Sequence, residues 1–306
     1  MILTADWHLR SSRPRCRLDN DWIETQMNAL KQIEKYSKKY GCPIVVVGDV
    51  FDTAAADITF TLLFKIQQWA AQLEYPLYLL AGNHDLQYHD IANIEKSGVG
   101  ILLGSDNIHH ILKMGDIPGI GNISAFNFGE EKIHNKVFSD QEGCDIVFLH
   151  RLVFPDAKSM PPNVKANTAK ELLDEFSDAT YIFTGDYHKS FIYEKKGRFV
   201  INPGCILRQS ANEKEYECGV YLIDTDKQEH MPLLIKDEEE LVTDEYLREE
   251  EAREDRIESF VELLKSKGSV SLDFVKNVET RIKENKQLEG LVVDTVRELI
   301  YEGGGE

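Results

Sequence analysis

The sequence contains few cysteines, and they are not arranged as disulfide or metal-binding pairs. Five cysteines are spread over 306 residues, their number is odd, and no two of them form a C-x-x-C motif. This pattern argues against a disulfide framework and against a zinc ribbon. A reducing compartment, the cytoplasm, is therefore the expected location.

Long apolar runs are also missing. No run approaches the roughly 18 residues that a membrane-spanning helix needs, so no membrane partner is expected. The sequence opens directly on an apolar stretch, MILTAD, without a preceding basic segment. That opening is not typical of a signal peptide.

Positive charge is scarce. Lysine and arginine number 35 against 53 aspartates and glutamates, which gives a net charge of -18. This balance argues against unaided, sequence-independent binding to duplex DNA, because such binding depends on neutralising phosphates. The acidic excess is concentrated after residue 236, and residues 10–17, RSSRPRCR, hold four arginines. We interpret these arginines either as a solvated surface loop or as a phosphate-contacting lip beside a site.

Apolar runs of strand length end on Asp, Asn or His at five places, residues 3–8, 44–52, 76–85, 145–150 and 181–188. A protein core excludes such side chains unless they are paired or bound to a metal. Open α/β sheets place their ligands at the carboxyl ends of parallel strands. In extended geometry Asp6 and His8 would share one face and could converge on one ion. The pattern therefore predicts a common site.

The order of elements indicates an α/β fold. Helical spacing over residues 21–40 and 59–73, the second helix with Asp57 or Thr59 as candidate cap, alternates with strands to give β-α-β-α-β. Antiparallel strand signals follow in the second half. After residue 236 the composition shifts to acidic helix formers, with helices expected over 238–265, 269–284 and 288–301. We expect one domain over residues 1–235 and a helical region over 236–306.

Five motifs occur in a fixed order: Asp6-x-His8, Gly48-Asp49-x-x-Asp52, Gly82-Asn83-His84-Asp85, His150, and Gly185-Asp186-x-His188. This pattern resembles the calcineurin-like metallophosphoesterase superfamily over residues 1 to about 210. Within that superfamily the chain is similar to the SbcD-type (Mre-type) nuclease subunits of double-strand-break repair complexes, including phage recombination versions. The segments that carry this finer likeness are GDVFDT at 48–53, GNHD at 82–85 and NPGCILRQS at 202–210.

The resemblance implies a four-layer α/β/β/α sandwich that binds two divalent cations, manganese or magnesium. It assigns the first cation to Asp6, His8, Asp49 and His188, and the second to Asp49 as a bridge with Asn83, His150 and Asp186. Asp186 stands where the nuclease family usually has histidine. A carboxylate is a harder ligand than imidazole, so the second site should still bind manganese or magnesium, with a different affinity.

Three further residues are candidates for catalysis. His84 follows a predicted ligand directly, so we expect it to donate a proton or a hydrogen bond to the phosphate or the leaving oxygen. Asp52 and Asp85 either orient neighbouring groups or stabilise the turns in which they lie. A pair of cations would cradle the phosphoryl oxygens between them.

For function, the resemblance implies a manganese-dependent exonuclease and endonuclease that acts on DNA ends. It further implies a homodimer formed through helices of the catalytic domain, and an SMC-like ABC ATPase bound through the C-terminal helices. Two other functions stay open. The negative charge favours a small-molecule or nucleotide phosphodiesterase, and Asp186 motivates a non-catalytic scaffold that binds DNA ends or the ATPase. The C-terminal helices could also pack on a core of their own.

Overall fold

The computed structural model describes residues 1–111, 114–118, 120–130, 145–237, 241–266 and 278. The chain divides into two compact units, Met1–Thr243 and Asp244–Glu306. The division follows Thr243 rather than residue 235, because residues after 235 still pack on the first unit. The Asp237 carboxylate lies 2.8 Å from the guanidinium of Arg17, and the N–H of Thr243 donates to the carbonyl of Cys16.

The first sheet contains six strands in the order β14-β13-β1-β2-β3-β4. Its parallel part is formed by β1 (Ile2–Thr4), β2 (Ile44–Val47), β3 (Leu77–Leu80) and β4 (Ile108–His110), and its antiparallel part by β13 (Gly219–Asp224) and β14 (Glu229–Leu234). Helices α1 (Trp22–Tyr40) and α2 (Phe60–Ala70) connect the first three strands. Asp21 and Thr59 cap these helices, so the β-α-β-α-β prediction is confirmed.

The second sheet also contains six strands, in the order β11-β12-β10-β7-β6-β5. These strands are β5 (Met114–Ile117), β6 (Gly121–Phe126), β7 (Ile146–His150), β10 (Tyr181–Gly185), β11 (Phe191–Lys195) and β12 (Arg198–Asn202). Strands β6, β7, β10 and β12 run parallel. Helix α5 (Ala169–Glu175) precedes β10, and the short strands β8 (Val153–Phe154) and β9 (Asn167–Thr168) pair beside it. The described part of the first unit also contains a short helix α3 (Gly98–Leu102) and three 3-10 turns, Gln87–His89, Ile91–Lys96 and Ala211–Glu213.

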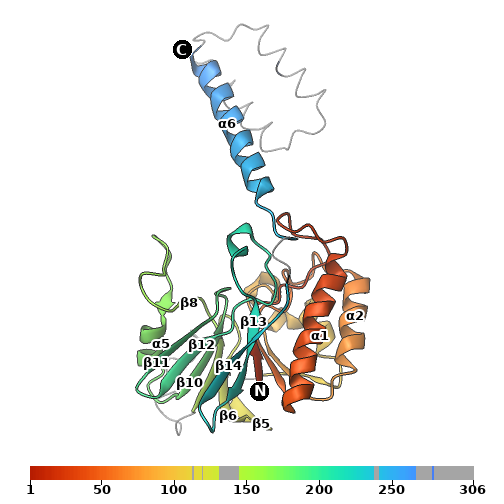
Figure 1. Cartoon of the computed structure of the whole chain (residues 1–306), viewed down its shortest axis with the longest axis vertical. Helices are drawn as coiled ribbons and strands as arrows, with labels where there is room; N and C mark the ends of the chain where they lie inside the picture. The colour runs from red at the N-terminus through yellow and green to blue at the C-terminus, as the bar shows by residue number, and fades with distance from the viewer. Residues whose placement is uncertain (112–113, 119, 131–144, 238–240, 267–277, 279–306) are drawn as a thin grey trace. The chain divides into compact units, whose positions relative to one another are not determined.

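Three hydrophobic layers hold the sheets and helices together. Along β2, Ile44 and Val46 pack toward α1 and α2, whereas Val45 and Val47 pack toward the second sheet. The far face of the second sheet packs on α5 through Leu172 and Leu173. Figure 1 shows α1 and α2 on one side of the sheets and α5 on the other. The architecture is the expected four-layer α/β/β/α sandwich.

The second unit contains helix α6 (Glu245–Ser266). This helix begins seven residues later than position 238, because the segment before it pairs with the first unit through the bridge between Arg17 and Val242. The two later helices that we expected lie outside the described residues, apart from position 278. Among the described residues, every helix is too short or too polar to traverse a lipid bilayer.

Candidate metal centre

The predicted ligands gather where the strands of both sheets end. Strands β1, β2 and β3 are neighbours in one sheet, and β7 and β10 are neighbours in the other. The turns after the strands pack closely at this edge because glycines leave room. A Cβ atom on Gly48 would lie 2.1 Å from Nδ1 of His150, and one on Gly82 would lie 2.1 Å from Oδ1 of Asp49. Glycine is therefore needed at both positions.

The ligand-bearing turns have unusual backbone angles. Asp6, His8, Asp49 and Asp186 all have positive φ, at 49°, 44°, 51° and 82°. Strand β1 ends at Thr4, so Asp6 and His8 do not share a face through extended geometry, and that expectation was wrong. Left-handed backbone at non-glycine residues is costly and is concentrated at functional sites. The turn conformation brings the two side chains together.

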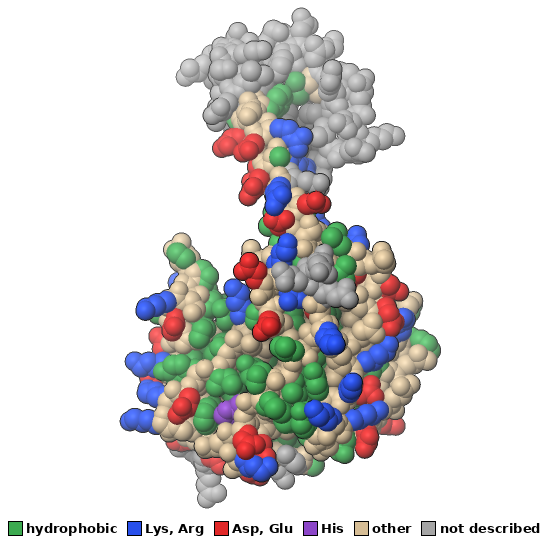
Figure 2. Space-filling model, viewed as in Figure 1, with side chains coloured by type: hydrophobic (Ala, Val, Ile, Leu, Met, Phe, Trp, Pro, Cys, Tyr) green, Lys and Arg blue, Asp and Glu red, His purple; other side chains and the backbone are tan. Residues whose placement is uncertain are grey.

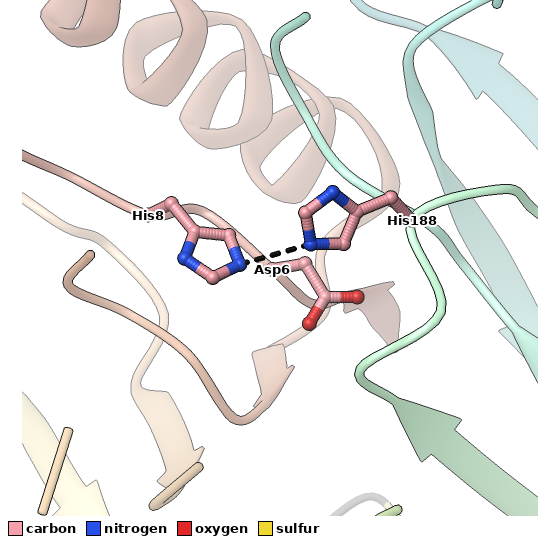
Figure 3. A group of neighbouring side chains, drawn as sticks. All are labelled: Asp6, His8 and His188. Atoms are coloured by element: carbon pink, nitrogen blue, oxygen red, sulfur yellow. Dashed lines mark hydrogen bonds between the residues drawn. The ribbon is translucent and has the colours of Figure 1, made fainter. Parts of the chain in front are cut away.

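A first group of ligand atoms comes from Asp6, His8 and His188 (Figure 3), whose ligand atoms all lie within 4.8 Å of one another. The Nε2 atoms of the two histidines are 3.1 Å apart. Asp6 accepts the backbone N–H of Asp186 on Oδ1, but its buried Oδ2 has no hydrogen-bond partner among the described residues. Burial raises the pKa of Asp6 to about 6. A nearby cation would favour its ionised form.

A second group comes from Asp6, Asp49 and His150. Oδ2 of Asp49 lies 3.2 Å from Nε2 of His150 and 3.7 Å from Nε2 of His8. This buried oxygen has no hydrogen-bond partner among the described residues. Nε2 of His150 is also 3.0 Å from Oδ1 of Asn83. One carboxylate oxygen thus faces both groups, as a bridging ligand must.

Hydrogen bonds at Nδ1 set the tautomers of two histidines. His150 is buried, and its Nδ1 lies 2.8 Å from the carbonyl oxygen of Val47, which can only accept. His188 places Nδ1 2.7 Å from Oε1 of Glu213. In both rings Nδ1 therefore carries the proton and Nε2 is turned toward the centre. Neutral imidazole binds metals through such a nitrogen.

The donor set fits divalent cations. Carboxylate and amide oxygens suit magnesium and manganese, and imidazole nitrogens suit zinc, copper, iron and nickel. Buried polar atoms without partners are uncommon in proteins, yet Oδ2 of Asp6, Nδ1 of His8 and Oδ2 of Asp49 have none among the described residues. Cations between the two groups would satisfy both carboxylate oxygens.

Comparison with known protein families identifies the family of this chain. The family model described as calcineurin-like phosphoesterase matches residues 1–190. The chain belongs to this family. Calcineurin-like phosphoesterases are metal-dependent hydrolases that use two divalent cations. A search of curated proteins finds no match.

Solved structures also resemble this calcineurin-like phosphoesterase. An archaeal phosphodiesterase is similar at 12% sequence identity and a TM-score of 0.40, over 76% of this chain and 98% of that one. A dimetal phosphatase from Danio rerio is similar at 11% identity and a TM-score of 0.45, over 77% of this chain and 98% of that one.

Asp186, at the position where the nuclease family usually has histidine, lies beside the second group. The residue is half-buried, and its backbone N–H is fixed by Asp6 at 2.9 Å. Burial raises the pKa of Asp186, while the neighbouring His150 opposes the rise. The charge of Asp186 in turn contributes to the raised pKa of His150. Among the described residues, none of the groups of candidate ligand atoms that lie within 4.8 Å of one another includes Asp186, so its assignment to the second cation stays a prediction.

His84 lies on the open side of the phosphoesterase centre and is exposed. Its ring is 4.9 Å from the ring of His8, and its Nδ1 lies 2.6 Å from the carbonyl oxygen of Asp52. Because that carbonyl only accepts, Nδ1 carries a proton, and Nε2 can donate only when the ring is protonated on both nitrogens. The Asp52 carboxylate pairs with Arg10 at 2.8 Å and lies 3.7 Å from Nδ1 of His8.

Asp85 has a structural position. Its fully buried carboxylate accepts the backbone N–H groups of Val50, Phe51 and Gly82. It thereby fastens the turn after β2 to the turn after β3. Burial raises the pKa of Asp85 to about 7. This placement corresponds to the turn-stabilising alternative.

The arginines of residues 10–17 have separate positions rather than forming one lip. Arg17 is buried and pairs with Asp19 at 2.7 Å and with Asp237 at 2.8 Å. Its inclusion among surface or phosphate-contacting arginines was therefore wrong. Arg13 and Arg15 are exposed, and Arg13 donates to the carbonyl of Asp19.

Sequence reasoning missed Glu213 and Gln209. Glu213 holds His188, and the side-chain amide of Gln209 donates to the carbonyls of Trp7 and His8. A signal for the first was available, because Ser210-x-x-Glu213 is a capping-box pattern, and the structure forms that box. The pattern predicts a turn, but it does not reveal that the glutamate also reaches His188, a predicted metal ligand.

Proposed function

We propose that this phosphoesterase is a two-metal DNA nuclease that acts on DNA ends, as the nuclease subunit of an SbcCD-like recombination and repair complex. The observation that carries the phosphodiesterase part is the buried Oδ2 of Asp49 between His8 and His150. The choice of DNA rests on the motif likeness to SbcD-type subunits over residues 48–53, 82–85 and 202–210.

The burial pattern shows from which side a substrate can reach the centre. Asp6, Asp49 and His150 are buried at the base of the centre, whereas His84 is exposed and the side chain of His188 is 35% exposed. The centre is thus approached from the side of these two histidines. When bound, two divalent cations supply Lewis-acid polarisation of the phosphoryl oxygens.

The protein residues take distinct roles in this proposal. Asp6, His8, Asp49 and His188 would hold the first cation, and Asp49, Asn83, His150 and Asp186 the second. His84, doubly protonated, would donate from Nε2 to the phosphate or the leaving oxygen. Its Nδ1 bond to the Asp52 carbonyl fixes the plane of the ring. Asp52 keeps Arg10 beside His8.

Two further surfaces support the proposed partners. Helix α2 exposes Phe60 at 91% and Phe64 at 59%, one turn apart, and a second copy of the chain would cover this strip in a homodimer. Helix α6 is acidic, yet it exposes Ile257 and Phe260 three residues apart. An SMC-like ATPase would bind there through an apolar groove with a basic rim.

The distribution of surface charge is compatible with DNA binding despite the net charge of -18. On the face drawn in Figure 2, lysine and arginine side chains lie among acidic ones on both flanks of the first unit. The acidic excess therefore does not cover this face. Local basic groups are what phosphate contacts require.

A manganese-supplemented assay on linear duplex DNA tests the proposal. We expect the full-length protein to degrade the DNA, and His84→Ala to lose this activity while keeping its cations. Addition of a candidate ATPase with ATP tests the partner in the same assay. DNA that stays intact under all these conditions would refute the proposed nuclease function.

The strongly negative net charge favours a second function, a small-molecule or nucleotide phosphodiesterase on the same centre. A chromogenic phosphodiester separates the two. Turnover of the diester together with intact DNA would establish this second function. Absence of both activities in a protein that carries two cations would favour a non-catalytic scaffold.

A further inference from the structure

Glu213 divides its two carboxylate oxygens between two tasks. Oε1 lies 2.7 Å from Nδ1 of His188. Oε2 accepts the backbone N–H of Gln209 at 2.7 Å and that of Ser210 at 3.1 Å. Glu213 is buried, so these bonds are shielded from water. Two backbone N–H groups of the same turn therefore hold the carboxylate in place, independently of its bond to His188.

The same short turn also reaches the other histidine of the first group. The side-chain amide of Gln209 donates to the carbonyls of Trp7 and His8, at 3.0 and 3.1 Å. One segment thus holds the ring of His188 and the backbone of His8. Their Nε2 atoms lie 3.1 Å apart as a result. This spacing brings two imidazole nitrogens to one point.

His188 needs such support more than His150 does. His150 is buried, and a backbone carbonyl fixes its Nδ1. The side chain of His188 is 35% exposed, on a strand exit where Asp186 has positive φ. Without a partner at Nδ1, this ring could rotate or carry its proton on Nε2. Either change would remove the lone pair that faces the centre.

We propose that Glu213 is a positioning residue for the first cation: it keeps a proton on Nδ1 of His188, so that Nε2 is the nitrogen that faces His8 and Asp6. A carboxylate partner also makes the imidazole a more basic ligand than a carbonyl partner does. The inference rests on cation binding by the first group of residues. It does not depend on whether the substrate is DNA.

Glu213→Gln is the informative substitution, because it keeps the size of the side chain and removes one acceptor. If the new carbonyl oxygen faces the two backbone N–H groups, the NH₂ group faces His188 and forces the proton onto Nε2. If the side chain is flipped, the NH₂ group opposes the two backbone donors and loosens the turn. Either way, the carboxylate's double role is lost.

Titration of manganese into the chelator-treated full-length protein, followed by calorimetry, provides the first readout. We expect Glu213→Gln to weaken binding at one of two sites by about 10–100-fold, the usual effect of removing a residue that holds a metal ligand. Glu171→Gln is the matched control, because Glu171 closes the capping box of α5 without touching a histidine. It should leave both affinities unchanged. Wild-type affinity at both sites in Glu213→Gln would overturn the proposal.

The second readout measures the histidine tautomer in the wild-type protein, so its result does not depend on how well Glu213→Gln folds. In the protein loaded with diamagnetic zinc, ¹H–¹⁵N spectra of the imidazole rings should show His188 with a proton on Nδ1 that exchanges slowly with water. Loss of that signal in His188→Ala assigns it. A His188 ring with its proton on Nε2 would overturn the proposal, whether or not the protein cleaves DNA.

Discussion

The two histidines that the second sheet contributes to the centre are supported in different ways. His150 is buried at the end of β7 and bonds to the backbone carbonyl of Val47 in the facing sheet. His188 follows β10 at the open edge and bonds to a side chain 25 residues later, Glu213. Backbone support survives most substitutions, because no side chain supplies it. Side-chain support can be altered by a single substitution.

Oδ2 of Asp49 lies between His8 and His150 and is the predicted bridge between the two cations, so Asp49→Ala is expected to have the largest effect. Both ions should be lost together. The rate of phosphodiester hydrolysis should fall by about a thousandfold or more, which corresponds to a loss of several kcal/mol of transition-state stabilisation. Metal analysis of the gel-filtered variant measures the ions. Retention of two ions would show that Oδ2 of Asp49 does not bridge.

His84 is not one of the two histidines compared above. Its substitution tests catalysis separately from cation binding. His84→Ala should reduce hydrolysis by about 10²–10⁴-fold, as expected for a lost proton donor, with two ions still bound. His109→Ala, at an exposed histidine on β4, serves as the control and should retain full activity. Loss of an ion in His84→Ala would instead make His84 a ligand.

Gly48→Ala perturbs the packing around His150, the histidine that a backbone carbonyl supports. The new Cβ would lie 2.1 Å from Nδ1 of His150, at a backbone φ of +84°. We expect about 1–3 kcal/mol of lost stability and a 10–100-fold weaker second cation. Gly197→Ala is the matched control, since its φ is +74° but nothing lies within 4 Å of the added Cβ. Calorimetric titration with manganese should show weakening in Gly48→Ala only. Equal manganese affinities in the two variants would show that contact with His150 is not the cause, and that backbone strain alone explains any loss of stability.

The smallest expected effect lies at Arg13 and Arg15, the exposed arginines of a loop in which Arg17 is buried. Alanines at the exposed Arg13 and Arg15 should weaken DNA binding only several-fold and lower the salt slope by up to about two. Arg17→Ala should instead destabilise the fold by about 3–5 kcal/mol, because it removes the ion pair of the buried Asp19 and leaves the buried Asp237 paired with Arg208 alone. Binding titrations at several salt concentrations and thermal melts measure these effects. An unchanged slope would make Arg13 and Arg15 solvated surface residues.

The sequence was most informative where chemistry and strand ends coincide. Apolar runs that end on Asp, Asn or His predicted both the parallel sheets and the residues gathered between them, because few other roles suit such side chains in a core. It was least informative about turns. Positive φ at Asp6 and His8 comes from contacts with the turn after β2, where His8 donates its backbone N–H to the carbonyl of Asp49.

Burial of charge was equally hard to predict. Four arginines in eight residues indicate exposure, yet Arg17 is buried because Asp19 and Asp237 neutralise it. Asp237 lies 220 residues away in sequence, so no local pattern connects the two. Glu213 escaped prediction for the same reason. Its turn has a recognisable motif, but its contact with His188 exists only once both sheets are formed.

Strand β1 lies in the interior of its sheet, between β2 and β13, where Ile2 pairs with Leu222. Because β1 precedes β13 by more than 200 residues, its residues are synthesised long before the strand that completes the sheet on that side. Non-local pairing of this kind is slow to form. We expect a nascent chain to lack the assembled centre until β13 has been synthesised, so the cell would not encounter an active hydrolase on unfinished polypeptides.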